Sequence, residues 1–293
     1  MTLLGTLPLR EVTEQAHEAA EKSLLPPRHQ RVDGAARVAF GPAGLSDLYQ
    51  KAPCRLLFPD IETGDFPQAV SITTSGGLTG GDRVVLDISI EPGACATVST
   101  QAAEKLYRVL PDDPAIHIET RINIAEGGRC EWLAQEAILF DRSQVRRHLH
   151  AHLAADARLL AVETIVFGRA AMGEVYAEGL IHDEWRIWRS DELIWADALH
   201  IDGKFAEIAA QPFCLGPARA LATMVYAGAD AADHLPLARE MSDGCATCFG
   251  ELLLVRLIDA DSRLLRSRVM RAASALRAAT LGLPDRLPAV WYC

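Results

Sequence analysis

The sequence lacks the features of several large protein classes. No run of apolar residues approaches the ~18 that a membrane-spanning helix needs. Residues 1–9 have neither the cationic start nor the long apolar core of a signal peptide, so we expect no secretory leader. Basic residues are outnumbered, because 29 Lys and Arg stand against 39 Asp and Glu, for a formal net charge of −10. This excess of acid argues against broad binding to nucleic acid or to an anionic membrane, since both need a basic face.

The common nucleotide-binding and nucleophile motifs are also missing. The sequence has no Gly-x-x-x-x-Gly-Lys-Ser/Thr phosphate loop and no Gly-x-Gly-x-x-Gly element opening a helix. It has no Gly-x-Ser-x-Gly elbow, and no pattern pairs a Ser or Cys with a His and an acid. We therefore expect that this chain alone neither binds nor hydrolyses GTP.

Seven cysteines are scattered along the chain, an odd number that is ordinary for a reducing cytoplasm and unlike a disulfide scaffold. Cys245 and Cys248 form a Cys-x-x-Cys pair, without the second pair of a zinc ribbon or the βαβ context of a redox motif. We interpret them as packing residues or a labile thiol pair. A zinc or redox module built on them remains an alternative.

The chain of 293 residues divides into a leader and a body. Residues 1–35 are polar and rich in Ala and Glu, which predicts a loosely ordered leader, and we expect a single β-rich domain over 36–293. Strand-like alternation dominates from about residue 36 to 210, whereas helical periods appear at 230–243 and 262–281. In the second helix one apolar stripe is clear, and four arginines fall largely off it: Arg263, Arg266, Arg271 and Arg277.

Glycine is unusually dense in one segment, where Gly76, Gly77, Gly80 and Gly81 fill four of six positions. Such density marks backbone that needs positive φ or close approach. The following segment, 83–90, has apolar residues at every second position, so the glycines join one strand to the next. We expect a tight structural turn that Asp82 is placed to cap.

Acidic residues interrupt the apolar faces of three predicted strands. Glu136 lies in phase with the apolar residues of 130–140, Glu163 with those of 159–167, and Asp197 with those of 193–201. A buried carboxylate is costly unless it is paired, hydrogen-bonded, neutralised or bound to a cation. A strand edge, a β-bulge or a buried Arg partner would explain any one of them. For all three together, a polar feature inside the β body explains the pattern as well as these separate local causes do.

Three histidines alternate along one predicted strand, so that His148, His150 and His152 share a face. Imidazole suits nickel, copper and zinc. Cα atoms two residues apart on a strand lie ~6.6 Å from each other, too far for all three rings to close around one ion without distortion. We favour a solvated polar face, with surface metal binding as the second interpretation.

Four motifs follow one another in a specific order: Gly76-Gly77-Leu78-Thr79-Gly80-Gly81-Asp82, Thr100-Gln101-Ala102-Ala103-Glu104-Lys105-Leu106-Tyr107-Arg108, Glu131-Trp132-Leu133-Ala134-Gln135-Glu136 and Gly168-Arg169-Ala170-Ala171-Met172-Gly173-Glu174. This ordered set resembles the UreD (also called UreH) family of urease accessory proteins, over roughly residues 50 to 293. We expect structural roles for the motif positions Gly76, Gly77, Gly80, Gly81, Lys105, Tyr107, Gly168 and Arg169.

The resemblance implies a non-enzymatic, cytoplasmic factor for urease maturation. Family members form a complex with the helical accessory protein UreF and the GTPase UreG, dock on the urease apoprotein, and help to deliver nickel. The expected fold is mainly β, with a stacked-strand, solenoid-like (β-helical) body and two α-helices in the C-terminal half. The implied metal is transient Ni²⁺ without a tightly bound cofactor, and neither nucleic acid nor a membrane is an expected partner.

A nickel path through the protein is proposed for the family, and the resemblance makes Asp82, Glu163 and Asp197 its candidate lining groups. Glu104 and Glu136 are weaker candidates, and Glu104 replaces a small residue often found in the family motif. Oxygen ligands suit Ni²⁺ only moderately, so they would hold it weakly enough to release it. Passage requires binding that permits both entry and exit.

A β-solenoid carbohydrase is the alternative from the enzyme class, with Glu136 and Glu163 as acid and base. It needs an open cleft with two carboxyl groups ~5 to 10 Å apart. It also needs aromatic platforms for sugar rings, for which the candidates are Trp132, Trp185, Trp188 and Trp195.

Overall fold

The computed structural model describes residues 31–292, so most of the predicted leader over 1–35 lies outside the described residues. The chain separates into the units Met1–Arg31 and Val32–Cys293. The second unit contains all the strands and helices that the structure describes, and its first strand, β1, begins at Asp33.

The strands of the described residues form two sheets. In spatial order, the seven-stranded sheet contains β14 (Glu192–Lys204), β13 (Glu178–Arg189), β10 (Gln144–Leu153), β8 (Ile116–Ile124), β5 (Arg83–Ile90), β1 (Asp33–Gly41) and β2 (Gly44–Lys51). The ten-stranded sheet contains β16 (Ala246–Phe249), β17 (Leu252–Asp259), β15 (Ala220–Ala227), β11 (Arg158–Arg169), β9 (Arg129–Leu139), β6 (Cys95–Thr100), β4 (Gln68–Thr73) and β3 (Cys54–Leu57), with β12 (Glu174–Val175) beside β11 and β7 (Glu104–Leu106) beside β9.

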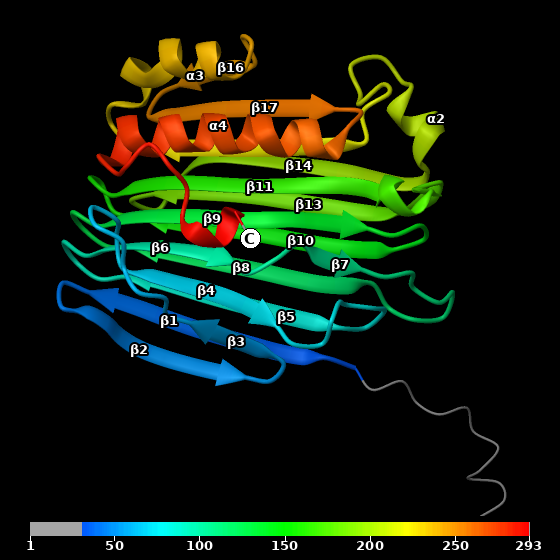
Figure 1. The fold of residues 1–293 in the computed structure, drawn as a ribbon, viewed down its shortest axis with the longest axis horizontal. Coiled ribbons are helices and arrows are strands. Elements are labelled where there is room, and N and C mark those ends of the chain that lie inside the picture. Colours follow the sequence, from blue (N-terminus) through cyan, green and yellow to red (C-terminus); the bar gives the residue numbers. More distant parts are fainter. Residues whose placement is uncertain (1–30, 293) are drawn as a thin grey trace, which may run out of the picture. The chain divides into compact units, whose positions relative to one another are not determined.

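Successive strands from β4 to β13 alternate between the two sheets, apart from the short β7 and β12 (Figure 1). The alternating strands pair in parallel within each sheet, whereas β2, β3, β14, β15, β16 and β17 add antiparallel pairs at the sheet ends. The mainly β part of the predicted fold class is confirmed. A β-solenoid is not established, because both sheets are open and mixed and end in antiparallel strands instead of further parallel turns.

Three α-helices lie within the described residues: α2 (Phe205–Ala209), α3 (Leu235–Met241) and α4 (Ser262–Leu281). The helix predicted over 262–281 is therefore confirmed, and the one predicted over 230–243 is divided into a 3₁₀ turn and α3. Helix α2 was missed because five residues are too few to show a helical period. The 3₁₀ turns are η1 (Ala170–Met172), η2 (Ala231–His234) and η3 (Ala289–Tyr292).

Helix α4 has clear start and stop signals. The Asp261 side chain accepts a hydrogen bond from the backbone N–H of Arg263 at 2.8 Å, and Gly282 ends the helix at φ 69°. The helix lies across the outer face of the ten-stranded sheet, against β11, β15 and β17 (Figure 1). Its predicted apolar stripe is buried there, through Leu265, Val269, Ala273 and Leu276.

The arginines of α4 only partly follow the prediction. Arg263 is exposed, but Arg277 is fully buried, so the prediction that Arg277 lies away from the buried face of the helix is wrong. Its Nε donates to Glu131 Oε1 at 2.8 Å, and its Nη2 donates to Asp65 Oδ1 at 3.1 Å. A guanidinium tolerates such burial because two carboxylates neutralise it and satisfy its donors.

Two apolar cores result from strand alternation, one between the sheets and one beneath α4. Strand β9 contributes to both, because Cys130 and Trp132 face the first core while Leu133 faces the second. The space between the two sheets is therefore a packed interior in which any polar group must find a partner.

A register shift between β9 and β11 changes the face on which Glu136 lies. Val162 pairs with Leu133, whereas Thr164, two residues later, pairs with Glu136, three residues later. The extra residue directs Glu136 toward α4, where its Oε1 lies 2.6 Å from Arg266 Nη1. The prediction that Glu136 shares the inner apolar face is wrong, because such a bulge interrupts the alternation.

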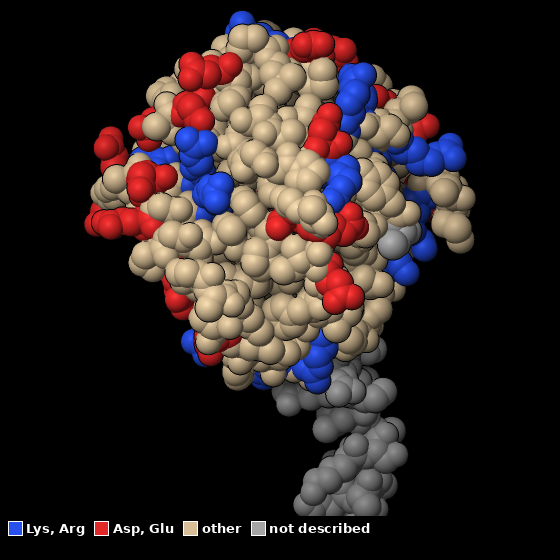
Figure 2. All heavy atoms as spheres, turned by 60° about the vertical axis from the view of Figure 1, so that its left-hand side comes forward, with Lys and Arg blue, Asp and Glu red and all other residues tan. Residues whose placement is uncertain are grey.

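None of the helices within residues 31–292 combines the length and the apolarity needed to cross a bilayer. On the face drawn in Figure 2, acidic and basic side chains gather in small mixed groups around a broad uncharged area. This part of the described surface thus lacks the continuous basic stripe that typifies nucleic-acid-binding proteins.

Candidate functional site

A cavity of about 290 Å³ lies between the two sheets. Residues of β4, β7, β9 and β11 line it from the ten-stranded sheet, and residues of β5, β8 and β10 line it from the seven-stranded sheet. Three of the four sequence motifs contribute, through Gly76 and Gly77, through 100–105, and through Trp132, Ala134 and Gln135. Segments far apart in the sequence therefore meet at one internal site.

Arg147 and Glu163 line one side of this cavity, and Asp183 pairs with Arg147 beside it. Arg147 on β10 forms an ion pair with Glu163 on β11, and its Nε lies 3.1 Å from Asp183 Oδ1 on β13. Trp132 Nε1 donates to Glu163 Oε1 at 2.9 Å. Each of the three charged residues is less than 10 % exposed, at 7 %, 8 % and 8 % for Arg147, Glu163 and Asp183. The cluster therefore links the two sheets by charge within an apolar interior.

Glu104 also lines this cavity and adds a third carboxylate to the group around Arg147. It is half-buried and accepts a long hydrogen bond of 3.4 Å from Thr73 Oγ1. Loss of hydration raises the pKa of Glu104, and the positive charge of Arg147 opposes this. Burial likewise raises the pKa of Glu163, against the opposing effect of Arg147. Both carboxyl groups are thus harder to ionise than they would be in water.

The cluster has an excess of negative charge when its acids are ionised. Glu104, Glu163 and Asp183 would carry three negative charges, and Arg147 supplies one positive charge. In an interior of low dielectric constant this imbalance favours uptake of a proton or of a cation. The arrangement thus attracts a positive charge, but its three carboxylates do not converge into a three-ligand metal site.

Asp82 belongs to the glycine turn and not to the cavity lining. Its Oδ1 accepts a hydrogen bond from the backbone N–H of Val32 at 2.7 Å, and its Oδ2 accepts one from Thr79 at 2.8 Å. The backbone N–H of Asp82 in turn donates to the Thr79 oxygen at 3.0 Å. These bonds satisfy a buried carboxylate locally, in the capping role considered for it.

Asp197 and Glu136 also lie outside the cavity. Asp197 on β14 forms an ion pair with Arg256 on β17 and so joins one sheet to the other. Glu136 is held by Arg266 on the opposite side of the ten-stranded sheet. Of the five carboxylates predicted for a metal path, the structure brings only Glu104 and Glu163 together at the cavity.

The sequence-based prediction omits Arg147 and Asp183. Arg147 lies in phase with the buried apolar residues of β10, and Asp183 lies in phase with those of β13. The alternation that identified Glu163 was therefore present for both residues. Neither lies in one of the four motifs.

Motif residues also pack on one another beside the cavity. Gly77 has φ 144°, and a Cβ atom there would lie 2.5 Å from the ring of Tyr107. The Tyr107 hydroxyl donates to the Gly76 oxygen at 2.9 Å, and its ring meets Phe140 edge-on at a centroid distance of 4.8 Å. The guanidinium of Arg169 lies 3.9 Å from the centre of the Phe140 ring. The first motif therefore contacts the second directly at Tyr107, and the second and fourth motifs meet on Phe140.

Backbone contacts place other motif positions. Gly81 donates to the Pro114 oxygen at 2.8 Å, and Leu78 donates to the Lys105 oxygen at 2.8 Å. Gly168 pairs with the short strand β12 at the end of β11. These bonds tie the glycine turn to the strands that flank the cavity.

The geometry does not support the two alternative functions. Glu136 and Glu163 lie on opposite sides of the ten-stranded sheet and cannot act as an acid and base pair in one cleft. Cys245 is exposed and Cys248 is half-buried. Across residues 31–292, the only three His, Cys, Asp or Glu side chains close enough to share a metal ion are His148, His150 and Glu184, which include neither cysteine.

The comparisons with known proteins agree with one another on a single family. A family model described as UreD urease accessory protein matches residues 32–292. The chain is similar to a protein named Urease accessory protein UreD from Magnetococcus marinus, with 37% identity over 276 residues, covering 89% of this chain and 94% of that protein. It is also similar to proteins of the same name from a Methylobacterium species, at 39% over 280 residues, and from Rhizobium leguminosarum, at 41% over 273 residues. Each of these two alignments covers 90% of this chain and 96% of the relative.

Proposed function

The chain belongs to the UreD family of urease accessory proteins, and we propose that it serves urease maturation as a scaffold and nickel carrier, not as an enzyme. In this role it joins UreF-type and UreG-type accessory proteins to the urease apoprotein in the cytoplasm. The GTPase partner supplies nucleotide dependence, since this sequence has no phosphate loop of its own. Nickel is the cargo of the process.

The observation that supports a nickel-carrying role is the composition of the cavity. Segments of three family motifs line it, and the carboxylates of Glu104 and Glu163 are among its walls. Because Arg147 offsets only one of the nearby negative charges, a divalent cation would supply the positive charge that the cluster lacks. Membership of the family and the chemistry of the cavity thus favour the same cargo.

Carboxylate oxygens suit transient handling of Ni²⁺. They are harder ligands than thiolates or imidazoles and hold this ion less firmly. Arg147 weakens binding further, because its charge repels the cation and competes for the same oxygens. The proposed path uses Glu104, Glu163 and Asp183, whereas Asp82, Glu136 and Asp197 serve local structure through their own partners.

A co-expression experiment tests the proposed function. Urease structural subunits are produced with UreF and UreG homologues, with and without this chain, and scored for nickel content and urease activity. We expect both quantities to fall when the chain is omitted. Unchanged activation without it would refute the maturation role.

The internal path is tested in the same system with Glu104→Gln. The control is Glu207→Gln, because Glu207 is an exposed glutamate whose side chain is 70% accessible and paired only with Lys204. We expect both variants to retain their partners in a pull-down, and only Glu104→Gln to lower the nickel content of urease. Full nickel loading by Glu104→Gln would remove Glu104 from the path.

A further inference from the structure

The outer face of the seven-stranded sheet carries six histidines among the described residues. His117 lies on β8, His148, His150 and His152 lie on β10, His182 lies on β13 and His200 lies on β14. Ring centroids are 5.9 Å apart for His148 and His150, 5.9 Å for His148 and His182, and 5.5 Å for His182 and His200. This band of imidazoles lies on the side of the sheet opposite to Arg147, because neighbouring residues of a strand face opposite sides.

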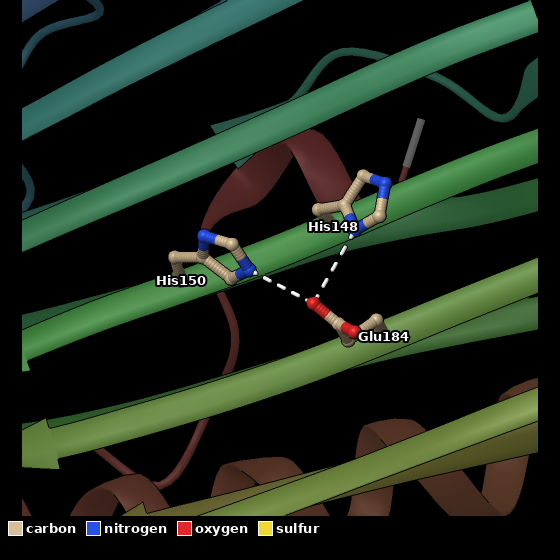
Figure 3. A group of neighbouring side chains, drawn as sticks. All are labelled: His148, His150 and Glu184. Atoms are coloured by element: carbon tan, nitrogen blue, oxygen red, sulfur yellow. Dashed lines mark hydrogen bonds and ion pairs between the residues drawn. The ribbon is translucent and has the colours of Figure 1, made fainter. Parts of the chain in front are cut away.

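Three side chains of this face form a compact group of potential ligands (Figure 3). One ligand atom each from His148, His150 and Glu184 lies within 4.8 Å of the other two. Glu184 Oε1 lies 3.1 Å from His150 Nε2 and 3.5 Å from His148 Nδ1. Strand register explains the grouping, since His148 pairs directly with Glu184 in the parallel β10 and β13 pair.

We propose that His148, His150 and Glu184 bind one divalent first-row transition-metal ion that accepts imidazole ligands, with Ni²⁺ and Zn²⁺ as the best candidates. Bonds of about 2.0 to 2.1 Å around a tetrahedral ion separate neighbouring ligand atoms by about 3.3 Å. The two distances to Glu184 Oε1, 3.1 and 3.5 Å, lie on either side of that value. The two imidazole nitrogens lie within 4.8 Å of each other, so rotation of the His148 ring brings both onto one ion, and water completes the coordination.

Neighbouring groups hold the proposed ligands in place. The second oxygen of Glu184, Oε2, lies 3.1 Å from Arg186 Nη2, which orients the carboxylate and leaves Oε1 directed at the histidines. The His150 ring meets the Trp188 ring edge-on at 5.5 Å, which restricts its rotation. Both strands lie inside the sheet with neighbours on each side, so little reorganisation accompanies binding.

The third histidine of β10 has a different role from its neighbours. His152 stacks on Trp188, with ring centroids 4.4 Å apart and an interplanar angle of 2°. Glu184 on the neighbouring strand β13 therefore supplies the third ligand, which a third histidine of β10 is too distant to provide. This explains how a metal site can form although the spacing along β10 alone argues against one.

The proposal does not rest on the role in urease maturation and is tested on the purified full chain. Equilibrium dialysis and calorimetry with Ni²⁺ alone, and separately with Zn²⁺, measure stoichiometry and affinity for the wild type, His148→Ala/His150→Ala and His152→Ala. The last variant is the matched control, because it removes the same side chain from the same face of the same strand. We expect the double variant to lose one equivalent of metal that the control retains.

Spectroscopy identifies the ligands directly. With Cu²⁺ as the probe, the wild type should show nitrogen hyperfine coupling from two imidazoles, and His150→Ala should show coupling from one fewer. Circular dichroism and the thermal midpoint of each metal-free variant establish that it is folded. Should the double variant not fold, Glu184→Gln takes its place, with an expected loss of affinity of about tenfold or more.

Two results would overturn the proposal. One is equal metal stoichiometry and affinity in the wild type and in a folded variant of the three ligands. The other is loss of the same equivalent in His152→Ala, which would assign binding to the histidine-rich face in general and not to this group.

Discussion

Replacing Glu163 by Gln separates a cavity with excess negative charge from a simple structural ion pair. The substitution keeps the shape of the side chain and removes its charge. Trp132 Nε1 donates to Glu163 Oε1 at 2.9 Å, and Arg147 donates to Oε2, so the single amide oxygen of Gln can accept from only one of these two donors. The substitution therefore removes one negative charge next to Arg147 together with one hydrogen bond.

The expected cost follows from the partners that Arg147 keeps. Asp183 remains 3.1 Å from its Nε, so the guanidinium is not left unpaired. A hydrogen bond to a charged group contributes about 1.5 to 3 kcal/mol, so Glu163→Gln, which loses one such bond, should cost about 2 kcal/mol. Arg147→Met leaves buried carboxylates without a cation and should cost about 3 to 5 kcal/mol.

Urea denaturation of the purified wild type, Glu163→Gln and Arg147→Met measures these differences in the free energy of unfolding. In parallel, the co-expression assay measures partner binding and the nickel content of urease for Glu163→Gln, with Glu207→Gln as the exposed control. We expect Glu163→Gln to fold, to bind its partners and to deliver less nickel, because the cavity then offsets less of the cation's lost hydration.

Two outcomes would refute this reasoning at different points. If Glu163→Gln loses as much stability as Arg147→Met, Glu163 is an indispensable structural partner and the excess-charge argument fails. If a stable Glu163→Gln loads urease fully, its charge has no part in nickel delivery.

Leu276→Asp should lower the free energy of unfolding by about 3 kcal/mol or more, because Leu276 is 1% exposed on the buried side of α4. A loss below about 1 kcal/mol in urea denaturation would contradict that packing. Gly77→Ala should lower the thermal midpoint more than Gly93→Ala. Both glycines have positive φ, but only a Cβ atom at position 77 would meet other atoms, those of Tyr107 and Lys105. Equal midpoints of the two variants would contradict this close approach. Burial raises the pKa of Cys54 to about 11, so on the order of 0.1% is thiolate at pH 8. Iodoacetamide followed by mass spectrometry should label the exposed Cys214 in the native protein and Cys54 only after unfolding, and rapid native labelling of Cys54 would show that it is accessible.

Local patterns in the sequence determined much of the architecture. Alternating apolar residues predicted a mainly β body, and the stripe over 262–281 predicted α4 with its bounds, because both periods follow from backbone geometry alone. The glycine-rich turn was likewise predictable, and the order of four motifs identified the family that the comparisons confirm. These signals are carried by residues close together in the chain.

Tertiary structure decided which of these residues act together. A single extra residue in β9 moved Glu136 to the α4 side, and no local pattern indicates such a bulge. Parallel pairing brought Glu184 beside His148 and His150 and Asp183 beside Arg147, and the packing of two sheets placed Glu163 against Arg147. Strand partners and register depend on contacts between distant segments, and a shift of one residue reverses the face of every side chain that follows. The sequence therefore determined the alternation of side chains along each strand, and only the folded chain determined where a bulge changes their face and which of them meet.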